Sequence, residues 1–240
     1  MEEVSVLKLR IKFAKRGYMK FVGHLDTMRY FQKAIRRADI DIAYSEGFNP
    51  HQLMSFAAPL GVGMTSEGEY MDIVVKSATS SEAIKKSLNE TMVEGMEIIS
   101  VVKLPDDSKN AMSIVAAADY SIKYREGYEP DIDIKSKFDE FLSQESIIIT
   151  KKTKKSEKEV DIRPSIYEAK YADGIFELKL ASASGEYLKP DLVFQAFNNY
   201  CGITDGKCTE LKLALLINRV EVYAKNDNGF IPLEGLGGSF

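Results

Sequence analysis

The 240-residue sequence has no tryptophan, two histidines and two cysteines. These small numbers limit the disulfide bonds and metal or iron–sulfur sites that it can form. Cys201 and Cys208 do not form a C-x-x-C pair, and two thiols are too few for a disulfide framework. The C-x-x-x-C-x-x-C motif is absent, and [4Fe–4S] clusters are usually held by four cysteines. The chain is therefore not itself a radical SAM enzyme, and we expect it to bind no metal and no cofactor.

Long apolar runs and an excess of positive charge are also missing. No segment approaches the roughly 20 apolar residues that span a membrane, and none resembles the hydrophobic region of a signal peptide. The formal net charge is −4, so any affinity for nucleic acid has to come from a local patch of cations. We expect a cytoplasmic protein with no membrane association.

The pattern of apolar residues predicts an α+β protein. Residues 7–13 alternate apolar and cationic side chains, as a half-buried strand does, and residues 26–38 have helical spacing with Asp26 as the expected N-cap. Both halves of the chain follow the element order of two tandem ferredoxin-like (split βαβ) domains with antiparallel sheets. We place these domains at residues 1–107 and 108–225, followed by a loosely ordered Gly-rich tail at 226–240.

The loop at residues 44–51 gathers polar side chains around a turn shaped by Gly47 and Pro50. Both histidines of the chain lie in or near this loop, and an imidazole titrates near neutral pH. The candidate site residues are His24, Asp26, Tyr44, Glu46, Asn49 and His51. His24, His51, Tyr44 and Glu46 are the catalytic candidates among them. The alternatives are that Asp26 caps the helix, that His51 fixes the turn, or that the histidines and Glu46 hold a metal.

Cations are concentrated in the first quarter of the chain. Residues 1–60 contain ten Lys and Arg but six Asp and Glu, within a sequence that is acidic overall. We predict an RNA-binding surface made by one strand face and one helix face: Lys8, Arg10, Lys12, Arg29, Lys33, Arg36 and Arg37. Tyr18, Phe21, Tyr44 and Phe48 are available to stack on bases, although core packing is the alternative for Phe21 and Phe48.

Several segments resemble a known family when they are taken together. The segments are Gly23-His24-Leu25-Asp26, Tyr44-Ser45-Glu46-Gly47-Phe48-Asn49-Pro50-His51, Ser55-Phe56-Ala57, Gly68-Glu69-Tyr70, Val160-Asp161-Ile162-Arg163-Pro164 and Asn218-Arg219-Val220-Glu221. They are similar to the radical-SAM-associated bacterial domain of unknown function, which is free-standing or C-terminal to radical SAM proteins. In that family Pro-Lys or Pro-Arg often follows the loop histidine, whereas Gln52-Leu53 follows His51 here. The resemblance implies a radical SAM partner and a role near RNA processing or translation.

Three hypotheses follow. The first is an accessory protein that binds RNA or presents a substrate to a partner radical SAM enzyme in RNA modification or translation. The second is a metal-independent endonuclease-like enzyme of RNA processing, with His24 or His51 as acid or base. The third is an adaptor that contacts only other proteins.

Overall fold

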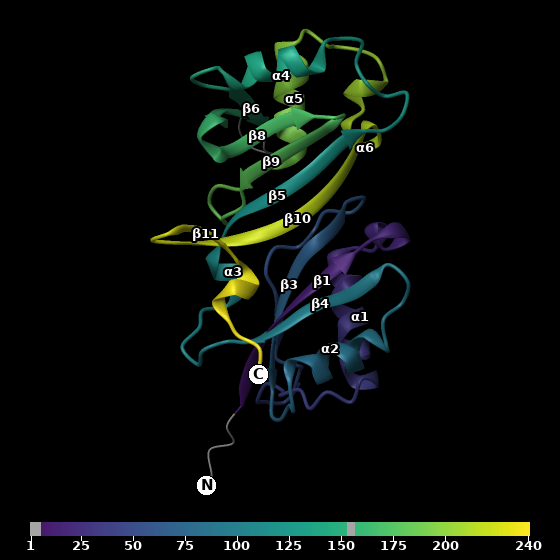
Figure 1. Ribbon diagram of the computed structural model, residues 1–240, viewed down its shortest axis with the longest axis vertical. Helices are drawn as coiled ribbons and strands as arrows, with labels where there is room; N and C mark the ends of the chain where they lie inside the picture. The colour runs from purple at the N-terminus through teal and green to yellow at the C-terminus, as the bar shows by residue number, and fades with distance from the viewer. Residues whose placement is uncertain (1–5, 153–156) are drawn as a thin grey trace. The chain divides into compact units, whose positions relative to one another are not determined.

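The computed structural model describes residues 6–152 and 157–240, and the chain forms two compact units (Figure 1). The first unit comprises Met1–Ala116 and Glu221–Phe240, and the second comprises Ala117–Val220. The predicted boundary between residues 107 and 108 differs from this division, which falls within strands β5 (Val115–Tyr124) and β10 (Leu215–Asn226). The residues on both sides of the predicted boundary belong to the first unit, in which Leu104 N donates to Lys8 O at 2.9 Å.

The sheet of the first unit places four strands in the order β4-β1-β3-β2, and the pairs are antiparallel. Their bounds are β1 Leu7–Lys15, β2 Met54–Phe56, β3 Thr65–Val75 and β4 Met96–Lys103. Helices α1 (His24–Arg37) and α2 (Ser81–Asn89) supply Phe31, Ile35, Ile84 and Leu88 to a core with Leu9, Ile11 and Phe13 of β1. The predicted inward face of the first strand is confirmed, since its apolar residues are those that the helices cover (Figure 1).

Helix α1 begins earlier than predicted. Gly23 is its N-cap, and Gly23 O accepts hydrogen bonds from Thr27 N at 2.9 Å and Thr27 Oγ1 at 3.0 Å. The prediction of Asp26 as N-cap is therefore wrong. Asp26 lies exposed in the first helical turn, where its negative charge is favourable beside the free N–H groups of the helix end.

The C-terminal segment is packed against the first unit, which corrects the prediction of a loosely ordered tail. Strand β11 (Gly229–Pro232) pairs with β10, and the 3-10 turn at Leu233–Leu236 buries Leu233 completely. Gly238 and Lys103 exchange backbone hydrogen bonds of 2.8 and 3.0 Å. The glycines that suggested flexibility instead permit close approach: a Cβ on Gly237 would lie 2.6 Å from Lys103 O.

In the second unit β9 pairs antiparallel with β5 on one side and with β8 on the other, and β6 and β7 form a separate two-stranded antiparallel sheet. The strands are β6 Ile148–Lys152, β7 Glu157–Asp161, β8 Ile166–Ala172 and β9 Ile175–Ala181. Asp173 and Gly174 both have positive φ, as the turn of the predicted β8-β9 hairpin requires. Helices α4 (Ile134–Leu142) and α5 (Pro190–Tyr200) pack through Phe138, whose ring lies 4.9 Å from Phe176 and 5.3 Å from Phe197.

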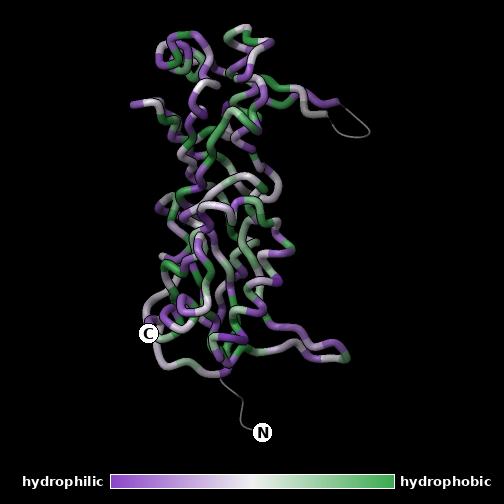
Figure 2. The backbone as a smooth tube through the Cα atoms, turned by 90° about the vertical axis from the view of Figure 1, so that its right-hand side faces the viewer, coloured by the Kyte–Doolittle hydropathy of each residue, from purple (hydrophilic) through white to green (hydrophobic). Residues whose placement is uncertain are grey.

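Two short helices complete the described chain, α3 (Ala111–Ile114) and α6 (Leu211–Ala214). The α+β class with mostly antiparallel strands is confirmed, whereas the finer description as two ferredoxin-like domains stays a prediction. Hydrophilic and hydrophobic segments are interspersed along the backbone (Figure 2).

Candidate functional site

The predicted site loop, residues 44–51, is closed at its base by backbone hydrogen bonds. Ser45 N donates to His51 O at 2.8 Å, and Leu53 N donates to Ala43 O at 2.9 Å. Gly47 lies within the loop at φ 105°, a conformation that residues with a side chain rarely adopt. The sequence therefore gives this loop a defined shape, as predicted from its glycine and proline.

The side chains of Ser45 and His51 close the same loop. Ser45 Oγ accepts from His51 N at 3.1 Å and lies 2.8 Å from His51 Nδ1. Because Nδ1 is engaged, Nε2 is the imidazole nitrogen left for a ligand. No carboxylate hydrogen-bonds or forms an ion pair with His51 among the residues that the structure describes, so nothing here activates it as a strong base.

The other predicted loop residues do not converge on a recess. Tyr44, Glu46 and Asn49 are exposed, and Phe48 is fully exposed at the tip of the loop. Core packing, the alternative considered for Phe48, is therefore excluded, and its ring is free to contact a partner. Phe21 is likewise exposed.

His24 and Asp26, two candidate site residues, each contact a different neighbour. The half-buried ring of His24 packs edge-on against Phe56 at 5.3 Å, and Asp26 pairs with Arg29 at 3.2 Å on the surface of α1. Within residues 6–152 and 157–240, no hydrogen bond or ion pair joins His24 to Asp26 or either of them to the loop. The two candidate site residues therefore have separate neighbours, Phe56 for His24 and Arg29 for Asp26.

A cavity of about 390 Å³ lies beside the loop within the first unit. Its apolar lining residues come from β2, β3 and the neighbouring segments, and cationic and hydrogen-bonding groups come from Lys8, the loop and the segment after β4. Its lining comprises Lys8, His51, Gln52, Leu53, Met54, Ser55, Asp72, Ile73, Val74, Leu104, Ser108, Lys109 and Asn110. Two predicted residues, Lys8 and His51, are brought together here, although the sequence assigned them to different surfaces.

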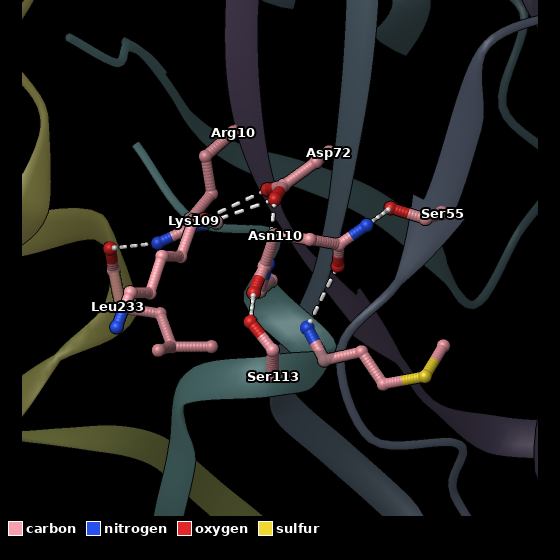
Figure 3. A network of polar contacts seen from close by, with 9 residues as sticks. Arg10, Ser55, Asp72, Lys109, Asn110, Ser113 and Leu233 are labelled. Carbon is pink, nitrogen blue, oxygen red and sulfur yellow. Dashed lines mark hydrogen bonds and ion pairs between the residues drawn. The ribbon is translucent and has the colours of Figure 1, made fainter. Parts of the chain in front are cut away.

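Asp72 is the only acidic residue in this lining, and its charge is neutralised by Arg10 (Figure 3). Arg10 Nε lies 2.7 Å from Oδ1 and Nη2 lies 2.9 Å from Oδ2, while Ala111 N donates to Oδ2 at 2.8 Å. Arg10 Nη1 also donates to Leu233 O at 3.1 Å. Only 1% of Arg10 is exposed, so it is a buried structural cation rather than the predicted RNA contact.

Lys12 belongs to a second network on the same face of the sheet. Its ammonium lies 2.6 Å from Glu221 Oε2 and 2.8 Å from Glu234 Oε1. Tyr70 Oη donates to Glu221 Oε1 at 2.7 Å, and Ser100 donates to Glu234. The predicted role of Lys12 in RNA binding is therefore not retained, because two carboxylates neutralise it.

Burial and pairing shift the pKa values of this network. Burial opposes the charge of Lys12, but its hydrogen bonds to Glu221 and Glu234 outweigh burial and raise the pKa of Lys12. Burial likewise acts against the charge of Glu234, yet Lys12 and Ser100 lower the pKa of that carboxyl. Burial, reinforced by Glu221, raises the pKa of Tyr70, which remains a neutral hydrogen-bond donor. Both shifts favour the charged forms of Lys12 and Glu234 at neutral pH.

The helix part of the predicted cationic surface remains exposed. Lys33, Arg36 and Arg37 are exposed on α1, and Arg29 is exposed although paired with Asp26. Among the residues that the structure describes, Lys33, Arg36 and Arg37 form no ion pair; Arg36 and Arg37 hydrogen-bond only to backbone carbonyls. We call Arg29, Lys33, Arg36 and Arg37 the cationic stripe.

Asp72, Glu221, Glu234 and Tyr70 are site residues that sequence reasoning missed. The sequence carries a signal for Asp72 and Tyr70, because they alternate with the apolar Met71 and Ile73 of β3.

Within the described residues, no group of three or more His, Cys, Asp or Glu side chains is arranged to hold a metal ion. No helix in the described part of the chain is both long and apolar enough to cross a membrane.

The fold and the cavity define an α+β protein with antiparallel sheets and a partly cationic ligand-sized site. Residues 8–190 match the family described as "Uncharacterized protein conserved in bacteria (DUF2344)", and the chain belongs to this family. No curated protein matches the chain. A solved structure titled "Crystal Structure of an Unknown Protein from Galdieria sulphuraria" is similar at 12% identity over 90% of this chain and 98% of that one, with a TM-score of 0.26. That score is too low to carry an argument.

Proposed function

We propose that this protein binds RNA through the cationic stripe of α1 and presents it to a partner radical SAM enzyme. The observation that carries the RNA part is the exposure of Lys33, Arg36 and Arg37 without carboxylate partners in the described chain. Cations that are already neutralised, such as Arg10 and Lys12, gain little from a phosphate. Unpaired exposed cations release counterions from the phosphate backbone and so contribute directly to binding.

Exposed aromatic side chains of the same unit support this proposal. Phe48 and Tyr44 project from the loop at residues 44–51, and Tyr18 and Phe21 are exposed in the turn that precedes α1. Aromatic faces stack on unpaired bases, and single-stranded RNA is usually recognised in this way. The cations would hold the backbone and the aromatic rings would hold bases.

The experiment compares two charge-reversed double variants by fluorescence anisotropy with a labelled single-stranded RNA. Lys33→Glu with Arg36→Glu alters the stripe. Lys76→Glu with Lys86→Glu makes the same change of charge at other exposed positions of the first unit. We expect the stripe variant to lose at least about tenfold in affinity and the control to lose far less. Equal losses would show that net charge matters rather than the stripe.

The salt dependence gives a second readout. Each phosphate contact to a single strand contributes roughly 0.7 to the slope of log affinity against log salt concentration. Losing two contacts should therefore reduce the slope by roughly 1.4. An affinity that does not respond to salt would contradict phosphate binding.

The radical SAM partner is proposed from the family resemblance of the sequence and is tested separately. Affinity purification of the wild-type chain should retain a radical SAM protein, with RNA removed by nuclease in one sample. Retention of a protein partner by a wild-type chain that shows no affinity for RNA would favour the adaptor hypothesis. No observation favours the endonuclease hypothesis, because His24 and His51 each contact a structural neighbour instead of a catalytic partner.

A further inference from the structure

We propose that the cavity beside His51 binds a nucleoside monophosphate, with the phosphate at its cationic side and the base against its apolar wall. This site goes beyond the proposed function, because it uses different residues from the cationic stripe. Its volume of about 390 Å³ falls in the range of small-molecule sites, which measure roughly 300–1,000 Å³. A single nucleotide fits this range, whereas a longer strand would have to leave the cavity.

The electrostatic balance of the lining favours an anion. Both oxygens of Asp72 are occupied, by Arg10 and by Ala111 N, so its charge is compensated before any ligand arrives. Lys8 and Lys109 remain as cations, and His51 adds an imidazole with Nε2 unengaged. Lysine binds phosphate as a compact charge, which fits the tetrahedral oxygens of a phosphate monoester.

Hydrogen-bonding groups beside these cations are already held in place. Asn110 Nδ2 donates to Ser55 Oγ at 2.9 Å, and Asn110 Oδ1 accepts from Met112 N at 2.9 Å (Figure 3). Ser55 therefore uses a lone pair internally, and no acceptor for its hydroxyl proton is seen in the described chain. Lys8 Nζ donates to Asp106 O, which ties the ammonium to the segment after β4. The phosphate would find donors that need little reorganisation.

The remaining wall has the character of a base-binding surface. Met54, Val74 and Leu104 provide apolar area, which suits the face of a nucleobase. Gln52 also contributes to the lining, but its amide is buried and donates through Nε2 to Gln32 O on α1 at 3.3 Å, so it belongs to the packing of the wall.

Isothermal titration of the full chain tests this site with AMP, GMP, CMP and UMP. The matching nucleosides are controls that lack only the phosphate group. Inorganic phosphate is the control that lacks the base and the sugar. We expect at least one nucleotide to bind at least tenfold more tightly than its nucleoside and than inorganic phosphate. Equal binding of nucleotide and nucleoside would overturn the phosphate anchor. Phosphate binding alone would mean an adventitious ion only, and no binding of any probe would overturn the proposal.

Variants then locate the binding. Lys8→Met removes a lining cation, and Val74→Phe fills the apolar wall without changing charge; each should weaken nucleotide binding at least tenfold. Lys86→Met, at an exposed position on α2 outside the cavity lining, is the matched control and should leave nucleotide affinity unchanged. Thermal unfolding of each variant confirms that it is folded. If the fold survives and both cavity variants bind like wild type, the assignment is wrong.

The nucleotide has two sources that competition can separate. A free nucleotide and the 5′-phosphorylated end of an RNA present the same chemistry. If a 5′-phosphorylated oligonucleotide displaces the nucleotide and its unphosphorylated twin does not, the cavity binds an RNA end. If neither displaces it, the ligand is the free nucleotide. Variants of the cationic stripe that lose RNA binding but keep nucleotide binding would show that the two sites act independently. Each proposal can then fail without the other.

Discussion

Arg10 on β1 and Asp72 on β3 are paired residues of adjacent strands and form a bidentate ion pair, with Nε–Oδ1 and Nη2–Oδ2 distances of 2.7 and 2.9 Å. Arg10 is almost completely buried, so its guanidinium depends on this carboxylate and on the carbonyl of Leu233. Arg10 is therefore an internal structural element of this strand. Its charge links β1 to β3 and to the C-terminal segment and is not offered to a ligand.

Removing one member of this pair should be severely destabilising. Asp72→Ala leaves a buried, unpaired guanidinium, and we expect a loss of about 3–5 kcal/mol in the free energy of unfolding measured with urea. The double variant Arg10→Met with Asp72→Leu removes both charges and should recover most of that loss. If Asp72→Ala costs less than about 1 kcal/mol, the pair is not the buried interaction that the geometry indicates.

The packing of the C-terminal segment predicts a difference between neighbouring glycines. A Cβ on Gly237 would lie 2.6 Å from Lys103 O and 2.8 Å from Val102 Cγ2, whereas a Cβ on Gly238 meets nothing within 4 Å. Gly237→Ala should therefore destabilise the protein by about 1–3 kcal/mol, as overpacking does. Gly238→Ala is the control and should stay within about 0.5 kcal/mol of wild type in the same urea titration. A loosely held tail would make both changes neutral.

The Lys12–Glu234 interaction predicts how stability depends on pH. The pKa of Glu234 is lowered in the folded state, so its contribution is present above the ordinary value of 4.5 and is lost as pH falls through the folded pKa. The pKa of Lys12 is raised, so its contribution is present below 10.5 and is lost as pH rises through the folded value. We expect Glu234→Gln to be less stable at neutral pH. Its urea midpoint should fall less steeply than that of wild type below pH 4.5. Parallel curves would contradict the assignment.

The two histidines should respond differently to truncation. His51 is exposed, so His51→Ala should cost less than about 1 kcal/mol in unfolding free energy. His24→Ala removes an edge-on contact with Phe56 from a half-buried position and should cost about 0.5–1.5 kcal/mol. Thermal and urea unfolding of both variants measure this order. A larger loss for His51→Ala would make its bond to Ser45 a major structural element and not a minor one.

The sequence by itself determined the features that depend on neighbours along the chain. Alternation at residues 7–13 identified a strand and its inward face, and Asp173-Gly174 forms a hairpin turn in which both residues have positive φ. Ser80 and Asp133 are of residue types preferred at helix N-termini, and they cap α2 and α4. The closed loop at residues 44–51 also follows from local chemistry, because its glycine, serine and histidine meet within a few residues.

Only the tertiary structure decided which charges are neutralised and which remain exposed. Arg10 meets Asp72 at a separation of 62 residues, and Lys12 meets Glu221 and Glu234 at separations of 209 and 222. No local sequence pattern encodes such distant partners. Arg10 and Lys12, on the cationic face of β1, therefore form ion pairs that the sequence did not predict, while the cationic face of α1 is exposed to solvent. The same long-range packing turns a Gly-rich segment into a close-fitting strip against β4, because glycine allows backbone approach as readily as it allows flexibility.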